Sequence, residues 1–199
     1  MSTTSLLDAN AAAVRASVDV VARAVARDLT RPTPCAGWDL ETLLRHMTAQ
    51  HRGFAAAASG RGADPTAWEL PAAGPGVLTA YRDADDDVLA AFAVADVLDR
   101  PFRIPEFGEQ PVPGRLAVGF HLVDYVVHGW DVARSLGAPF DPGADALAVT
   151  LPIVRGVPDD PARHEPGAAF APARKVPGDA APLTEILLLL GRDPAAPLS

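Results

Sequence analysis

The chain has 199 residues, of which 49% are hydrophobic and 21% are charged, and its formal net charge is −8. This composition is typical of a globular domain, and the negative charge argues against nucleic-acid binding, which requires basic patches. No apolar run approaches the ~20 residues of a membrane span, and the N-terminus lacks the pattern of a signal peptide. A single cysteine, Cys35, excludes an internal disulfide. We therefore expect a cytoplasmic protein.

Hydrophobic residues recur at helical spacing in four long segments, each of which is expected to form a helix. These segments are 3–29, 39–60, 76–98 and 113–136. Asp39 is a suitable N-cap for the second helix, and Gly137 is a suitable residue to end the fourth.

Proline and glycine mark the connections between these helices. Residues 101–113 contain too many prolines for a helix and predict a short hairpin or an extended lid before the fourth helix. Loops are expected at 60–75 and, rich in proline and glycine, at 156–182, with short helices at 143–155 and 183–190. The pattern predicts an all-α four-helix bundle with a short C-terminal helix, forming one domain over residues 1–199.

Three side chains that can bind a metal share one side of the predicted fourth helix. His121, Asp124 and His128 border an apolar stripe of that helix. The i, i+4 spacing of Asp124 and His128 would let both reach one metal ion. The same spacing also suits a buried hydrogen bond between a histidine and an aspartate, and the residues alone leave both interpretations open.

A further ligand would have to come from the second helix, where His46 and His51 are the candidates. A helical wheel places His51 near the middle of the apolar stripe and His46 on its flank, so spacing favours His51. Cys35 lies just before the N-terminus of the same helix, a position that can activate a thiol. A small buried apolar role is the more common one for such a cysteine.

Two motifs resemble a known family. Arg31-Pro-Thr-Pro-Cys-Ala-Gly-Trp-Asp39, followed by Leu43–Met47, resembles the second-helix signature of the DinB/YfiT-like superfamily. More narrowly, the motif resembles the branch that contains the metal-binding domain of mycothiol-dependent maleylpyruvate isomerase. Val126–Arg134 resembles the fourth helix of that branch, and the similarity extends to the closing segment 189–194.

The resemblance implies a four-helix bundle that binds a divalent metal through His46, Asp124 and His128. It thereby favours His46 over His51. The family usually has glutamate or histidine where Asp124 stands, and aspartate is shorter, so His121 is kept as the reserve ligand. Zinc is the first expectation for the metal, with nickel or iron as alternatives.

The function implied by the resemblance is a metal-dependent enzyme that uses a low-molecular-weight thiol such as mycothiol, for S-transfer or thiol-assisted isomerisation. In this hypothesis His121 or Asp131 orients a ligand or carries a proton, Arg134 holds a substrate carboxylate, and Trp130 stacks on the bound cofactor. The isomerase has a further C-terminal domain, so its own reaction is not transferred. A hydrolase with metal-bound water and a non-catalytic binding module are the alternatives. The expected partners are a small electrophile or thiol and a second copy of the chain in a homodimer, with neither nucleic acid nor a membrane.

Overall fold

The structure, a computed structural model, describes residues 3–165 and 168–198, and it confirms the all-α class. The helices are α1 (Thr3–Val21), α2 (Leu40–Ala58), α3 (Val77–Phe92), α4 (Gly114–Leu136), α5 (Ala144–Arg155) and α6 (Pro182–Leu189). Two short strands, β1 (Pro101–Phe102) and β2 (Val112–Pro113), pair antiparallel. Short 3-10 turns are η1 (Ala26–Asp28), η2 (Pro65–Trp68), η3 (Val97–Asp99), η4 (Pro105–Phe107) and η5 (Pro161–His164). In the described part of the chain, no helix is both long enough and apolar enough to cross a membrane.

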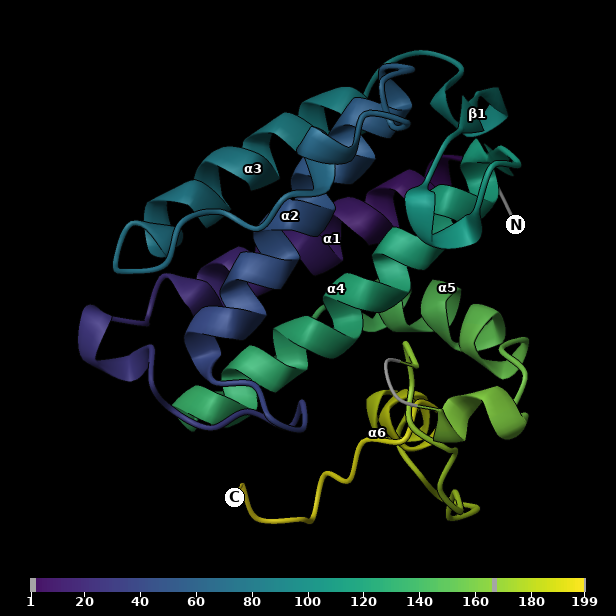
Figure 1. Ribbon diagram of the computed structural model, residues 1–199. Helices are drawn as coiled ribbons and strands as arrows, with labels where there is room; N and C mark the ends of the chain where they lie inside the picture. Colours follow the sequence, from purple (N-terminus) through teal and green to yellow (C-terminus); the bar gives the residue numbers. More distant parts are fainter. Residues whose placement is uncertain (1–2, 166–167, 199) are drawn as a thin grey trace.

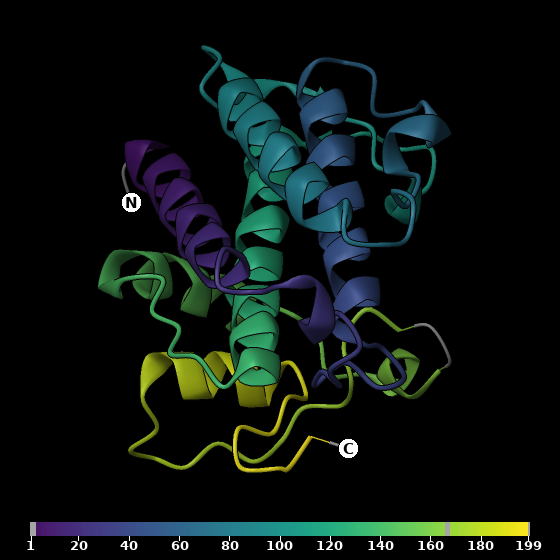
Figure 2. The same ribbon diagram turned by 90° about the vertical axis from the view of Figure 1, so that its left-hand side faces the viewer.

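The first four helices form a bundle (Figure 1). Helix α1 packs against α4 and α3, and α2 packs against α3 and α4, so α1 and α2 lie on opposite corners. Helix α5 packs against α1 and α4, and α6 packs against α5 (Figure 2). Helix α5 therefore covers one side of the bundle, and α6 lies outside it.

Both ends that the sequence assigned to α4, and the cap of α2, agree with the structure. The Asp39 side chain accepts a hydrogen bond from the Thr42 backbone N–H at 2.9 Å, as an N-cap does. Gly137 adopts a left-handed φ of 66° just after α4. The proline-rich segment 101–113 forms the expected hairpin, with Phe102 opposite Val112.

Two helices are shorter than expected, and each has a local cause. Helix α1 ends at Val21 instead of residue 29, and the Asp28 carboxylate accepts a hydrogen bond from the Val25 N–H at 3.0 Å. This side chain stabilises a turn where the helix would have continued. Helix α3 ends at Phe92 instead of residue 98, and Asp96 turns the chain with a left-handed φ of 62°.

Close approaches between segments explain two glycines of α4. A Cβ on Gly114 would lie 2.2 Å from the backbone oxygen of Val97. A Cβ on Gly129 would lie 2.5 Å from Cζ of Phe140 and 3.3 Å from Cβ of Ser17 on α1. Gly129 therefore permits the Phe140 ring to pack against α4 beside His128, and Gly114 permits the start of α4 to meet the turn at η3.

Candidate metal centre

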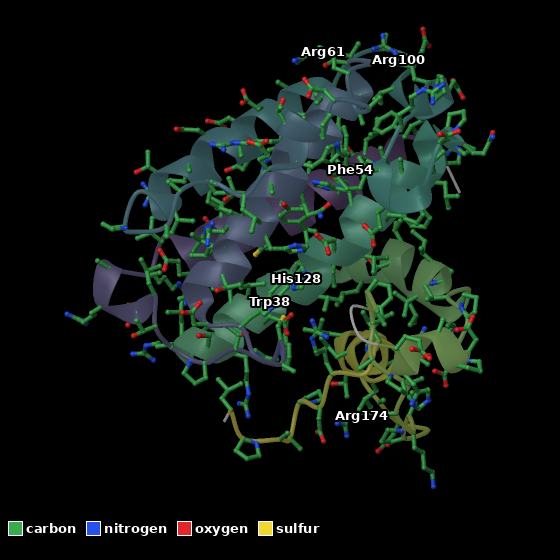
Figure 3. All side chains as sticks on the ribbon, in the orientation of Figure 1. Trp38, Phe54, Arg61, Arg100, His128 and Arg174 are labelled. Atoms are coloured by element: carbon green, nitrogen blue, oxygen red, sulfur yellow. The ribbon has the colours of Figure 1, made fainter. Side chains whose placement is uncertain are left out.

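Helices α2 and α4 bring three potential metal ligands together. His46 comes from α2, and Asp124 and His128 come from α4, and one ligand atom of each lies within 4.8 Å of the others. Nε2 of His128 is 3.4 Å from Oδ1 of Asp124, and the rings of His46 and His128 are 5.2 Å apart. The shorter reach of aspartate does not keep Asp124 away from this cluster. Figure 3 shows His128 at this level of the bundle beside Trp38.

The state of Asp124 tests whether the cluster fits a cation. Its Oδ2 atom is buried and has no hydrogen-bond partner among the residues that the structure describes. A buried carboxylate oxygen without a partner is costly. Two imidazole nitrogens and one carboxylate oxygen form a donor set suited to a divalent cation with open coordination positions. The residues present therefore fit such an ion.

The charges of the cluster bear on the protonation of its histidines. Burial lowers the pKa of His46, an effect that Asp124 partly opposes. Burial also disfavours a charged His128, but Asp124 and the hydrogen bond to Asp131 outweigh it and hold the pKa of His128 well above its ordinary value. A cation that binds Nε2 of His128 must therefore displace a proton, so metal binding is expected to depend on pH.

The opposite nitrogen of His128 faces a second polar group. Nδ1 lies 2.9 Å from Oδ2 of Asp131, which is fully buried. Arg192 donates to both oxygens of Asp131, and the Cys35 thiol lies 3.2 Å from Oδ2. Burial would raise the pKa of Asp131, but the hydrogen bonds and charges of His128 and Arg192 lower it instead. An ionised carboxylate only accepts, so Nδ1 of His128 donates and Nε2 is the nitrogen directed at Asp124.

A tight turn before α2 positions Cys35 and Trp38. The Trp38 N–H donates to the Cys35 carbonyl at 3.0 Å, and Gly37 takes the left-handed φ of 77° that this turn requires. The Trp38 indole then lies 5.0 Å from the ring of His46 and 6.5 Å from that of His128. Trp38 thus forms one wall of the cluster of His46, Asp124 and His128.

His51 and His121, the two alternatives left open by the sequence, pair with each other instead. Nδ1 of His51 lies 3.2 Å from Nε2 of His121, and the Asn10 amide donates to Nδ1 of His121 at 2.8 Å. Both rings are fully buried, and burial lowers the pKa of His121 to about 3. The helical wheel was right that His51 faces the core. His51 nevertheless lies at a different level of the bundle from His128, so it is not part of the cluster of His46, Asp124 and His128. His121 lies outside that cluster as well.

A cleft of about 720 Å³ adjoins the cluster at Trp38. Trp130 and Arg134 line it, together with Cys35 and Arg192. The Nη2 atom of Arg134 donates to the Ala196 carbonyl at 3.0 Å. The cleft therefore holds the two residues that were expected to contact a cofactor or substrate, on the Asp131 side of His128.

Sequence reasoning missed Arg192. It follows α6 in a segment with no helical periodicity of its own, and its partner Asp131 is 61 positions away. The only signal was the closing segment 189–194, which carried the resemblance without indicating a role for its arginine.

Comparison with known proteins shows which family the chain belongs to. Residues 10–133 match the family model described as "Mycothiol maleylpyruvate isomerase N-terminal domain". The chain belongs to this family. The family match covers α2 and most of α4, and with them His46, Asp124 and His128, but it ends before Arg134, α5 and α6.

Two curated proteins of Mycobacterium tuberculosis are similar to the chain. They are "Uncharacterized protein MT0763" from strain CDC 1551 / Oshkosh and "Uncharacterized protein Rv0738" from strain ATCC 25618 / H37Rv. Each is 28% identical over 173 residues, which cover 87% of this chain and 90% of the relative. No solved structure gives a significant match. These relatives extend the similarity beyond the family match without naming a reaction.

Proposed function

We propose that this protein binds a divalent metal through His46, Asp124 and His128 and uses it to activate a low-molecular-weight thiol of the mycothiol type. The reaction would be transfer of the thiol sulfur to an electrophile or a thiol-assisted isomerisation. The observation that carries the proposal is the cluster of three ligand atoms within 4.8 Å, in a chain of a mycothiol-related family.

The donor set supports a catalytic role over a purely structural one. Three protein ligands leave positions for an exogenous ligand, whereas structural zinc sites use four protein ligands. A bound divalent cation would supply the Lewis acidity that favours a thiolate at neutral pH. Asp131 would hold His128 in the orientation needed by the centre. Zinc suits two imidazoles and a carboxylate, and nickel or iron is the alternative.

The adjoining cleft offers a place for the body of the substrate or the thiol. Trp130 would supply an apolar wall for stacking, and Arg134 would pair with a carboxylate. In support, Nε of Arg134 is buried and has no acceptor among residues 3–165 and 168–198. His121 has no place in this chemistry, since its ring is fully buried and bonded to Asn10 and His51.

A conjugation assay tests the proposal. Zinc-loaded protein is mixed with mycothiol and monochlorobimane, and fluorescence reports the thioether that forms as the C–Cl bond breaks and the thiol proton is released. We expect wild type and the control His164→Ala, at an exposed histidine, to accelerate conjugation, and His128→Ala to remain at the uncatalysed rate. Conjugation by wild type no faster than by His128→Ala would overturn the proposal.

Two further measurements on the same protein distinguish the alternatives. Hydrolysis of an ester panel without added thiol would favour a metal-dependent hydrolase. Absence of any metal uptake by wild type would favour a binding module without metal chemistry.

A further inference from the structure

Arg192 reaches Asp131, the hydrogen-bond partner of His128, from a part of the chain outside the bundle. After α6, Gly191 turns the chain with a left-handed φ of 82°, and the Arg192 N–H donates to the Leu187 carbonyl at 2.8 Å. This pattern is a helix C-cap that reverses the chain direction. The cap directs the Arg192 side chain back to Asp131 on α4.

Arg192 contacts Asp131 through two of its nitrogens, and both side chains are almost fully buried. Nε of Arg192 lies 3.0 Å from Oδ1 of Asp131, and Nη2 lies 2.9 Å from Oδ2. The two side chains are 13% and 0% exposed. A guanidinium that holds both carboxylate oxygens fixes the plane of the carboxylate, which a single hydrogen bond does not.

The carboxylate so fixed is the partner of His128. Oδ2 of Asp131 accepts from Nδ1 of His128 at 2.9 Å, and Nη2 of Arg192 also donates to Sγ of Cys35 at 3.2 Å. A hydrogen bond at one nitrogen of a histidine sets both its ring orientation and the nitrogen left for a metal. The orientation of His128 thus depends on a residue 64 positions further along the chain.

We propose that Arg192 is a positioning residue for the metal centre: by holding both oxygens of Asp131, it keeps the His128 ring turned so that Nε2 faces His46 and Asp124. This inference rests on the proposed metal site. It assigns a role to the C-terminal segment, which lies beyond residues 10–133 that match the family. The segment after α6 thereby contributes to the site, since it supports one of the candidate ligands.

Zinc affinity and an NMR signal of the metal-free protein test the inference. The variants are Arg192→Met, Arg192→Lys and the control Arg155→Met, which removes an ion pair with Glu185 between α5 and α6. Zinc affinity is measured by competition with a chromophoric chelator. We expect Arg192→Met to raise the Kd roughly 10- to 100-fold, the range for loss of a residue that supports a ligand. Arg192→Lys should recover only part of the lost zinc affinity, because an ammonium group cannot hold both carboxylate oxygens as a guanidinium does. Arg155→Met should leave the Kd unchanged.

Zinc affinity of Arg192→Met measured in the Asp131→Asn variant distinguishes a positioning role from a general weakening of the fold. If Arg192 acts through Asp131, Arg192→Met adds little to the effect of Asp131→Asn on zinc affinity. In metal-free protein, the hydrogen-bonded Nδ1 proton of His128 should give a slowly exchanging downfield resonance that Arg192→Met removes. A purely structural role would lower the melting temperature of Arg192→Met without moving either readout.

The outcomes discriminate between the two proposals. Native zinc affinity in Arg192→Met overturns the positioning role, as does native affinity in Arg192→Lys if the methionine variant does not fold. If wild type itself takes up no zinc, the proposed function fails. The Nδ1 resonance then decides the role of Arg192: its retention in Arg192→Met overturns the inference, and its loss supports it.

Discussion

The buried pair of His51 and His121 should make the protein sensitive to mild acid. Burial in the folded state lowers the pKa of His121 to about 3, whereas an unfolded histidine titrates near pH ~6.5. The folded state therefore resists a proton that the unfolded state accepts. The contribution of His121 to stability is complete above pH ~6.5 and is lost as the pH falls toward about 3.

The magnitude follows from this difference in pKa. At pH 5 the unfolded imidazole is nearly all protonated and the folded one nearly all neutral, so moving from pH 7 to pH 5 costs about 2 kcal/mol through His121 alone. Burial and the neighbouring His121 also lower the pKa of His51, which acts in the same direction. Other groups titrate with the opposite sign, since burial raises the pKa of Asp85 to about 6. The comparison must therefore be a difference between variants.

Urea unfolding of wild type and His121→Phe at pH 7 and pH 5 isolates the contribution. Phenylalanine keeps an aromatic ring among Phe54, Phe92 and Tyr125 but cannot take a proton. We expect the loss of stability between the two pH values to be about 2 kcal/mol smaller in His121→Phe, whatever its stability at pH 7. The exposed-residue control His164→Phe should behave as wild type. An equal pH dependence in wild type and His121→Phe would refute the reasoning.

Two further predictions address packing and the wall of the cluster. Gly114→Ala should lower the free energy of unfolding by about 1–3 kcal/mol in urea titrations, because its Cβ would meet the Val97 carbonyl, which cannot rotate away; a stability equal to or above wild type would contradict the close approach. Zinc or nickel should change the tryptophan fluorescence through Trp38, which lies 5.0 Å from His46. Trp38→Phe should still bind metal but lose most of that change, and an unchanged signal would place the metal elsewhere.

Much of the fold could be predicted from the sequence, because it depends on interactions between residues close together in the chain. Asp39 caps α2 and Gly137 ends α4 through contacts within a few residues of each helix end. The prolines of 101–113 exclude a helix wherever that segment lies. The early end of α1 was missed because the side chain of Asp28, which folds back onto Val25, competes with a helical pattern that otherwise continues.

The choice between His46 and His51 shows where the residues alone fall short. They are five positions apart, about 7.5 Å along a helix, and both face the interior of the bundle. Helices α2 and α4 run antiparallel, so that His46 meets His128 and His51 meets His121. A helical wheel gives the face of a helix but not the level at which two helices meet, which long-range packing decides. Only the family resemblance pointed to His46.

Zinc location is the most direct test of the proposed centre. Crystals soaked in zinc, with diffraction measured at the zinc absorption edge, would give an anomalous peak for each bound ion. We expect one peak within about 2.0–2.2 Å of a nitrogen of His46, Nε2 of His128 and an oxygen of Asp124. No peak at that position, or a peak only between His51 and His121, would contradict the proposed centre.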